Sequence, residues 1–331
     1  MQKRKLGRTG LEVSVLGYGA GAVGGLFTKG DAADQERAVA RAIEAGINYF
    51  DTAALYGNGE SEKNLGRVLK ALKANVVVGT KVRLNTVHRA DVGKGIMRGM
   101  EDSLKRMGRD HVDLFQLHNP LVSKDAGDHL AIDIALNEVA PALDKLRKQG
   151  KTRFVGFSGV GETPALLKAI ESKLFDTIQV VYNALNPSAG WPMPKGAPGQ
   201  DYGRLFDKAK AADMGTIIIR ALAGGALAGT AERHPLAMQQ VDPIGSAPNF
   251  ARLARQRLKR LSARHVGGEP ARARRALRDL PSGGIDHAGR LFDPRTARGG
   301  DCRGDQGPTA GCAAQAHRRL KHSVAIGNIR Q

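Results

Sequence analysis

Cysteine is nearly absent from this chain of 331 residues, which contains two, Cys302 and Cys312. Their spacing matches no common metal-binding or redox motif, and nothing in the sequence indicates a secretory setting in which a disulfide would form. We therefore predict no metal site and no structural disulfide.

Long apolar runs are missing as well. No stretch of 18 consecutive apolar residues occurs, so the sequence predicts no transmembrane helix and no membrane partner. The first ten residues, MQKRKLGRTG, are basic but lack the apolar segment of a secretory signal. We expect a cytoplasmic protein.

Acidic residues are scarce in the last quarter of the chain. Residues 1–250 hold 33 Lys and Arg against 26 Asp and Glu, whereas residues 251–331 hold 18 against 6. Most of the net charge of +19 therefore comes from this segment, which is typical of a solvated tail or of a nucleic-acid-binding arm. Phe292 is its only aromatic residue, which disfavours a nucleic-acid partner.

Apolar runs alternate with amphipathic stretches up to about residue 250. After a hairpin over residues 3–14, we predict strands at 15–23, 47–52, 76–82, 112–118, 152–158, 177–183 and 215–222, and helices near 34–45, 61–73, 90–107, 134–149, 163–174 and 203–213. The strands are continuously apolar, as expected when helices cover a parallel sheet. Seven such units favour a parallel (β/α) barrel, and a doubly wound sheet is the alternative.

The eighth strand of such a barrel should lie between about residues 275 and 300. No strand pattern is visible there, and from 264 to 320 Arg, Gly and Ala dominate without periodicity. We therefore predict an α/β fold, a (β/α)8 TIM barrel over residues 1–260 whose eighth βα unit is missing or scrambled. Residues 261–331 then form an irregular Arg/Gly-rich tail.

Four polar side chains stand at the predicted carboxyl ends of successive strands: Asp51, Tyr56, Lys81 and His118. Each has an ordinary structural explanation, since Asp51 can cap a loop and a lone histidine is often a satisfied core residue. Lys81 is harder to explain in this way, because a central parallel strand offers no solvated face. Barrel enzymes carry out their chemistry at the carboxyl ends of the strands, so the presence of all four side chains there indicates a catalytic site.

Proton transfer to a carbonyl oxygen is the chemistry that these residue types favour. Tyrosine, whose unperturbed pKa is about 10, needs a nearby cation to act as an acid–base catalyst at neutral pH. A buried lysine that a carboxylate keeps charged supplies that cation. A histidine can orient the substrate oxygen while a cofactor delivers a hydride.

A second motif competes with this interpretation. Residues 19–24, GAGAVG, fit the glycine pattern of a Rossmann dinucleotide site. The acid of that site should follow about 20 residues later, at the end of the next strand, but Asp51 lies about ten residues beyond that point. We interpret the match as chance in a glycine-rich stretch.

The chain resembles the aldo-keto reductase family over residues 3–250. The segments that match in order are LGRTGLEVSVLGYGA, GINYFDTAALYGNGESEKNLG, VVVGTKV, RDHVDLFQLHNP, RFVGFSG, FDTIQVVYN and GTIIIRALAGGAL. The resemblance implies a TIM barrel, the cofactor NADP with NAD as an alternative, and reduction of aldehydes or ketones or oxidation of sugar-type alcohols.

The same resemblance assigns the site residues. It implies that Asp51, Tyr56, Lys81 and His118 are catalytic, with Tyr56 as the general acid. It further implies cofactor contacts from Asp51, Ser158, Gln179, Arg220, Leu222 and Gly224, with Ser158 and Gln179 on the nicotinamide carboxamide. Gly159 stands where the family often has Asn, and this departure puts one carboxamide contact in doubt.

The family pattern stops near residue 260, and a change of reading frame can restore it. When translation starts at the second base of each codon, residues 285–311 can encode STTLVGYSTLEQLEEAIAAATKGPLP. That peptide resembles the family's eighth strand, its phosphate-binding loop and the following helix. We hypothesise that the tail from about residue 260 is translated out of frame.

The function retains one alternative from a different class. A catalytically impaired cofactor-binding barrel can act as a partner or regulatory protein, because a barrel can bind a ligand without turnover. The substrate is expected to be a small carbonyl compound or a sugar, and Trp191 either lines its pocket or packs a loop. The sequence does not predict the oligomeric state.

Overall fold

The computed structural model describes residues 1–193, 195–197, 199–227, 233–241 and 284–286. Its centre is a curved parallel sheet, formed in spatial order by β3 (Tyr18–Gly19), β4 (Tyr49–Asp51), β5 (Val77–Val82), β6 (Val112–Leu117), β9 (Thr152–Gly159), β10 (Thr177–Val181), β11 (Gly215–Ile219) and β12 (Gly284–Asp286). Each strand pairs with the next parallel strand of the sequence. A doubly wound sheet would reverse this order at its centre, so that alternative is wrong.

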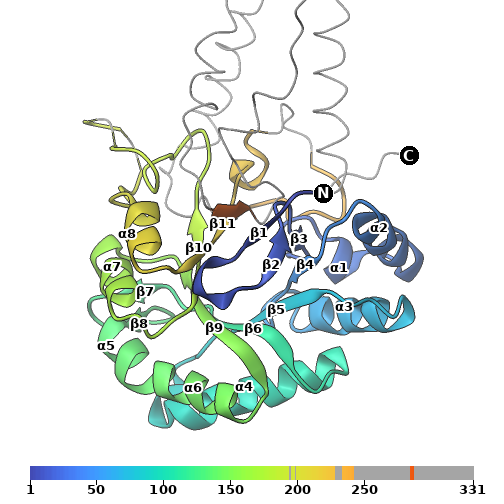
Figure 1. Cartoon of the computed structure of the whole chain (residues 1–331), viewed down its shortest axis with the longest axis horizontal. Helices are drawn as coiled ribbons and strands as arrows, with labels where there is room; N and C mark the ends of the chain where they lie inside the picture. The colour runs from blue at the N-terminus through green and yellow to red at the C-terminus, as the bar shows by residue number, and fades with distance from the viewer. Residues whose placement is uncertain (194, 198, 228–232, 242–283, 287–331) are drawn as a thin grey trace, which may run out of the picture.

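Helices follow the strands and line the outer side of the curved sheet (Figure 1). They are α1 (Leu26–Lys29), α2 (Ala32–Glu44), α3 (Glu60–Ala71), α4 (Val92–Met107), α5 (Ile132–Ile134), α6 (Ala140–Lys148), α7 (Thr163–Glu171) and α8 (Leu205–Ala211). Single turns add η1 (Gly7–Thr9), η2 (Val87–Ala90), the π-helical η3 (Ala135–Val139) and η4 (Ala223–Gly225). The alternation confirms the predicted (β/α) barrel architecture.

A three-residue strand lies between residues 275 and 300, where the sequence shows no strand pattern. Gly284–Asp286 forms β12, which pairs in parallel with residues 216–218 of β11. Backbone hydrogen bonds define this strand, and its three residues include a single apolar side chain, which is too short a pattern for periodicity to detect. Among the described residues β12 has no pairing with β3, and any helix after β12 lies outside them. The predicted irregular tail also lies outside the described residues, apart from β12.

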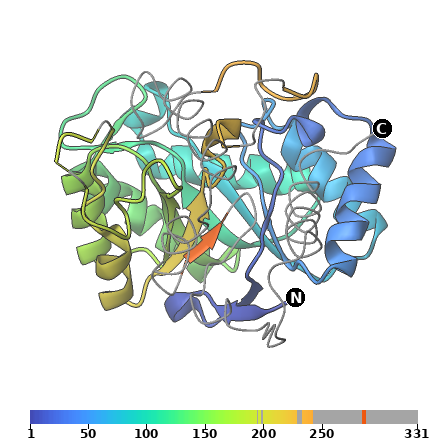
Figure 2. The ribbon, with the colours of Figure 1, turned by 90° about the horizontal axis from the view of Figure 1, so that it is seen from above.

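A small hairpin closes one end of the sheet. Its strands, β1 (Lys3–Lys5) and β2 (Glu12–Ser14), pair in antiparallel fashion, as predicted. The Arg8 backbone N–H donates to the carbonyl of Asp213 at 2.7 Å, just before β11 begins. The hairpin therefore covers the amino-terminal ends of the strands, which leaves their carboxyl ends for the site (Figure 2).

The interior of the sheet changes character along its strands. Next to the hairpin lies an apolar cluster made of Leu6, Leu11, Val13, Tyr49, Leu114 and Ile217. Side chains alternate between the two faces of a strand, so Asp51 and Gln116, two positions beyond Tyr49 and Leu114, share the inner face with them. Toward the carboxyl ends of the strands the buried residues include polar ones: Asp51, Lys81, Gln116, Ser158 and Gln179. The larger apolar cluster, on the other face, joins the sheet to the helices.

A second small sheet lies beside the carboxyl end of β9. It consists of β7 (Leu121–Val122) and β8 (Leu130–Ala131), which pair in parallel. The helices of the described residues include none that is both long enough and apolar enough to cross a membrane. The cytoplasmic location stays a prediction.

Candidate active site

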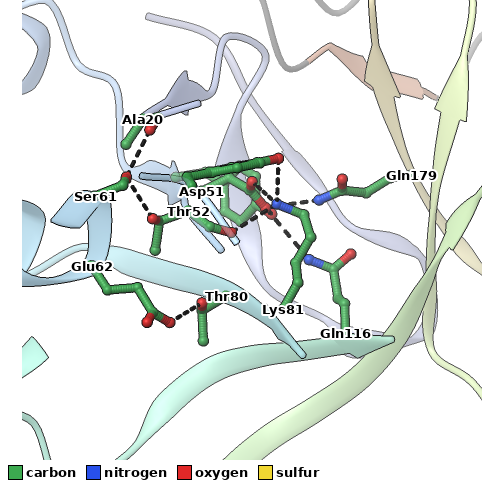
Figure 3. A network of polar contacts seen from close by, with 11 residues as sticks. Ala20, Asp51, Thr52, Ser61, Glu62, Thr80, Lys81, Gln116 and Gln179 are labelled. Atoms are coloured by element: carbon green, nitrogen blue, oxygen red, sulfur yellow. Dashed lines mark hydrogen bonds and ion pairs between the residues drawn. The ribbon is translucent and has the colours of Figure 1, made fainter. Parts of the chain in front are cut away.

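The structure brings the four predicted catalytic residues together at the carboxyl ends of the strands. Asp51 is the last residue of β4, Lys81 lies near the end of β5, and His118 directly follows β6. Tyr56 lies in the loop between β4 and α3. The strands and the loops that follow them therefore bring an acid, a cation, a phenol and an imidazole close together. Figure 3 shows Asp51 and Lys81 at the centre of this group.

The ammonium of Lys81 is completely buried, with a side-chain exposure of 0%. It forms an ion pair with Asp51 and donates to the Thr52 carbonyl at 2.7 Å and to the Tyr56 hydroxyl at 3.3 Å. An ammonium has three N–H donors, and each of them meets an acceptor here. The direction in which Lys81 points is therefore fixed by its partners.

The charge of Lys81 is maintained by the same contacts. Burial by itself lowers the pKa of this ammonium, but the charge of Asp51, the proximity of Tyr56 and the hydrogen bonds to both raise the pKa above the ordinary value of lysine. The structure therefore holds a permanent cation against the oxygen of Tyr56.

Asp51 receives more donors than the sequence predicted. While its Oδ2 faces Lys81, its Oδ1 accepts from Gln179 Nε2 at 2.7 Å, from Tyr49 Oη at 3.0 Å and from Gln116 Nε2 at 3.4 Å. These donors compensate the burial of the carboxylate, whose exposure is 1%. Figure 3 shows the two glutamine amides directed at Asp51 from β6 and β10.

Tyr49 and Gln116 were not among the predicted site residues. A signal for both exists in the sequence, because Tyr49 stands two residues before Asp51 and therefore shares its face of the strand. Gln116 similarly interrupts the apolar run of β6, two residues before His118. A buried amide in such a strand needs a polar partner.

The ring of Tyr56 lies between a cation and an imidazole. Lys81 Nζ is 4.8 Å from the centre of the ring. The His118 ring meets it edge-on, with ring centres 5.6 Å apart. Because the Tyr56 oxygen accepts from Lys81, the phenolic proton can be donated to another oxygen in the site. This arrangement suits acid–base chemistry.

A tight turn presents Tyr56 to the site. The backbone at Gly57 and Gly59 has φ angles of 61° and 90°, which glycine adopts without strain. A side chain on Gly59 would also approach the Arg106 side chain to 2.5 Å. Behind the turn, Thr52 donates to Ser61, and Ser61 donates to the Ala20 carbonyl, both at 2.7 Å.

A second buried carboxylate anchors the helix that begins after this turn. Glu62 on α3 is 0% exposed and forms an ion pair with Arg106 of α4 at 2.5 Å. Its other oxygen accepts from the Thr80 hydroxyl of β5 at 2.5 Å. Thr80 and Lys81 are neighbours, so Glu62 connects the two helices to the strand that carries Lys81.

Apart from Asp51 on β4, the residues predicted to hold a cofactor lie on β9, β10 and the loop after β11. The hydroxyl of Ser158 is buried and has no hydrogen-bond partner among the described residues. Gln179 lies on the adjacent strand, where its amide donates to Asp51. A side chain at Gly159 would come within 2.7 Å of the Gln179 carbonyl, so the glycine there matches the close packing of β9 and β10.

The loop from Arg220 to Gly224 has an unusual backbone. Arg220, Ala223 and Gly224 all have left-handed φ angles, between 53° and 63°. When successive residues combine right-handed and left-handed helical φ and ψ angles, their N–H groups can point toward one position and form an anion-binding concavity. Leu222 is 37% exposed on this loop. Trp191, in the loop after β10, is 38% exposed.

No cluster of three or more His, Cys, Asp and Glu side chains that could hold a metal ion occurs within the described part of the chain. The GAGAVG stretch forms the loop between β3 and α1, and it is followed by a helix of four residues. A Rossmann site places the pyrophosphate at the start of a longer helix in a βαβ unit, so this geometry does not match one.

The fold and the site define a class, the (β/α)8-barrel proteins with a buried cluster of polar side chains at the carboxyl ends of the strands. Within that class, the chain belongs to the aldo/keto reductase family, whose family model matches residues 15–270.

Comparison with known proteins agrees with this assignment. The chain is 35% identical over 163 residues to L-galactose dehydrogenase of Arabidopsis thaliana, a match that covers 48% of this chain and 49% of the relative. It is 38% identical over 129 residues to a probable voltage-gated potassium channel subunit beta of Oryza sativa subsp. japonica, covering 36% and 38%. The chain spans about half the length of the curated relatives that it matches.

A solved structure supports the fold. The holo form of an aldo-keto reductase from Bacillus halodurans superposes with a TM-score of 0.56 and 24% sequence identity. The match covers 77% of this chain and 76% of that one. At this identity the likeness is one of architecture.

Proposed function

We propose that this chain is an NAD(P)-dependent oxidoreductase that interconverts a carbonyl group and an alcohol, with Tyr56 as the general acid and base. One observation supports this function most strongly. A buried ammonium, held by Asp51, contacts the oxygen of Tyr56 at 3.3 Å. In this position the ammonium can stabilise the negative charge on the oxygen after Tyr56 has transferred its proton.

The residues present fit a nicotinamide cofactor, preferentially NADP. The unpartnered hydroxyl of Ser158 and the amide of Gln179 lie on adjacent strands, where they can bind a carboxamide. The pyrophosphate would lie at the loop that contains Arg220, Leu222 and Gly224, because left-handed backbone of this kind occurs in anion-binding concavities. When bound, the cofactor supplies or accepts the hydride.

The side chains of the site transfer the proton and stabilise the charges that this transfer creates. In the direction of reduction, Tyr56 donates its proton to the carbonyl oxygen as negative charge develops there. Lys81 then stabilises the phenolate, and Asp51 keeps Lys81 charged and in place. His118 donates a hydrogen bond that orients the substrate oxygen. In the direction of oxidation, the same phenolate removes the proton of the alcohol.

The substrate class is a small carbonyl compound or a sugar. The relative from Arabidopsis is named for an aldose, L-galactose, which supports a sugar-type alcohol as one candidate. Trp191 is exposed on a loop at the carboxyl end of the barrel, where its ring can cover one face of a substrate.

Two spectrophotometric assays test this function. In one, NADPH or NADH is oxidised by a panel of aldehydes and ketones; in the other, NADP⁺ or NAD⁺ is reduced by free aldoses. We expect turnover in at least one direction with a preference for the phosphorylated cofactor. Absence of turnover in both directions, together with absence of cofactor binding, would contradict the proposal.

A binding role without turnover is the second candidate. The likeness to a potassium channel subunit beta supports it, because it links this chain to a protein named as part of a larger assembly. All four residues of the proton-transfer site are present here, which favours catalysis. Tight NADPH binding, measured by fluorescence, with no turnover on any substrate would favour the binding role instead.

A further inference from the structure

Tyr49 is a buried phenol that the proposed mechanism does not use. It stands two residues before Asp51 on β4, so both side chains point to the inner face of the sheet. The side chain is 1% exposed, and its hydroxyl donates to Asp51 Oδ1 at 3.0 Å. The site therefore contains a second tyrosine, which contacts Asp51.

Two glycines make the space that this ring occupies. A Cβ at Gly17 would lie 2.8 Å from Tyr49 Cδ1. A Cβ at Gly79 would lie 2.9 Å from Tyr49 Oη and 3.5 Å from Asp51 Oδ1. Side chains at these two positions would thus displace the phenol. The space left by the two glycines therefore allows the hydroxyl to contact the Asp51 carboxylate.

The hydroxyl remains a donor over the working pH range. Burial, and then the negative charge of Asp51, raise the pKa of Tyr49 well above the ordinary value of tyrosine. The phenol therefore keeps its proton and directs it at Asp51. The amides of Gln116 on β6 and Gln179 on β10 donate to the same oxygen.

We propose that Tyr49 is a positioning residue for the reaction at Tyr56: its hydroxyl holds Asp51 in the orientation that pairs with Lys81 and sets the pH at which the site exchanges its proton. The proposal rests on the proposed function for its kinetic consequence. The positive end of the Tyr49 O–H dipole lies against Asp51 and offsets part of its negative charge. Without this dipole the potential at Lys81 and Tyr56 is more negative, so both groups hold their protons more tightly.

Tyr49→Phe keeps the ring in its slot and removes the hydroxyl. We expect the midpoint of the pH–rate profile to move upward by about 0.5 to 1 pH unit, which lowers alcohol oxidation at neutral pH about three- to tenfold. KM for the cofactor should stay unchanged, because Tyr49 is not among the residues that we propose to hold it. A residue that served packing alone would lower the rate at every pH without moving the midpoint.

Gly79→Ala provides a second variant that changes no functional group. Its added methyl group displaces the Tyr49 hydroxyl from Asp51, so the midpoint should move in the same direction. In the double variant with Tyr49→Phe the methyl group meets no hydroxyl, and we expect no further shift. Tyr18→Phe is the matched control, because Tyr18 is a buried tyrosine of β3 that stacks on Phe50. Its profile should superpose on that of the unaltered chain.

A measurement without turnover separates this proposal from the proposed function. The chain has five tyrosines, so ¹³Cζ-tyrosine labelling gives a simple NMR spectrum in which Tyr56→Phe identifies the Tyr56 signal. We expect that signal to titrate at higher pH in Tyr49→Phe and in Gly79→Ala than in the unaltered chain and in Tyr18→Phe. Superposing titrations would overturn the proposal even if the chain is an active oxidoreductase. A shifted titration in a chain without turnover would uphold it while the proposed function fails.

Discussion

At the scale of single residues, the central feature is the completely buried ammonium of Lys81. Three acceptors, one of them charged, take its three N–H groups. A buried charge is tolerated only when it is paired and hydrogen-bonded in this way. Lys81, which we propose to assist proton transfer at Tyr56, is therefore also a residue on which the stability of the fold should depend.

Removing Lys81 should destabilise the fold more than removing the ion pair as a whole. Lys81→Met leaves the Asp51 carboxylate buried without its cation, and we expect a loss of about 3–5 kcal/mol in the free energy of unfolding. The double variant Asp51→Asn/Lys81→Met should be the more stable of the two. Urea denaturation measures both, with the exposed Lys63→Met as a control that changes stability by less than about 1 kcal/mol. A Lys81→Met variant as stable as the Lys63→Met control would contradict a stabilising role for the ion pair of Asp51 and Lys81.

Buried tyrosines should make the fold sensitive to alkali. Burial raises the pKa of Tyr182 to about 12 and that of Tyr18 and Tyr202 further above the ordinary value. A raised pKa means that the folded chain keeps a proton that the unfolded chain loses. Stability is thus fully present below about pH 10 and lost as the pH rises through the folded values.

The slope of that loss can be measured by urea denaturation at several pH values. Each such tyrosine contributes up to about 1.4 kcal/mol per pH unit. Tyr202→Phe should reduce the slope above pH 10 by about one such contribution and leave the slope between about pH 7 and 9 unchanged. Equal slopes above pH 10 would show that Tyr202 ionises as easily in the folded chain as in the unfolded one.

Some of these residues could be predicted from the sequence and others could not. The tetrad Asp51, Tyr56, Lys81 and His118 follows from polar groups at the ends of apolar strands, because chain order fixes which ends meet. The bond from Gln179 to Asp51 does not follow, since it depends on which rotamer a side chain adopts across the barrel. Tyr49 looks like a core aromatic until the position of its hydroxyl is known.

At the scale of elements, β5 joins the catalytic site to the helical layer. Lys81 points inward from this strand, and its neighbour Thr80 points outward to Glu62 on α3. Arg106 then extends the contact to α4. The sequence predicted the strand and the two helices because each of them has a long, regular apolar pattern. The Glu62–Arg106 pair was not, because both residues occur in ordinary amphipathic patterns.

Breaking this pair should loosen the helices around β5. Arg106→Met leaves the Glu62 carboxylate buried and without its cation, and we expect the free energy of unfolding to fall by about 3 kcal/mol. Arg98→Met, on the same helix, removes an arginine whose side chain is 77% exposed and should change it by less than about 1 kcal/mol. Equal urea midpoints for the two variants would rule out a structural role for the buried pair.

At the scale of the whole molecule, the described part of the chain contains eight parallel strands that pair in sequence order, with buried polar side chains toward their carboxyl ends. The hairpin covers the amino-terminal end, so the chemistry is confined to the carboxyl end. The sequence predicted seven strands from their length and apolar character. It did not predict β12, which is defined by its backbone pairing with β11. Three residues are too few for an apolar pattern that would identify a strand from the sequence.

The hypothesis of a frame change from about residue 260 makes a prediction about the coding DNA. One inserted or deleted base near codons 255–265 should restore the peptide STTLVGYSTLEQLEEAIAAATKGPLP. The restored chain should bind NADP more tightly, because that peptide resembles the family's phosphate-binding loop. A coding sequence that no single such change converts to this peptide would exclude the hypothesis, which stands apart from the assignment of the tetrad.

The central claim, that Tyr56 transfers the proton in a nicotinamide-dependent reaction, is tested most directly by the rate of NADPH oxidation with the best aldehyde of the panel. Tyr56→Phe is compared with the unaltered chain and with Tyr18→Phe. We expect Tyr56→Phe to lower kcat about 10²- to 10⁴-fold while NADPH binding stays within about twofold, and Tyr18→Phe to leave both unchanged. A Tyr56→Phe variant that retains the rate of the unaltered chain would contradict the account.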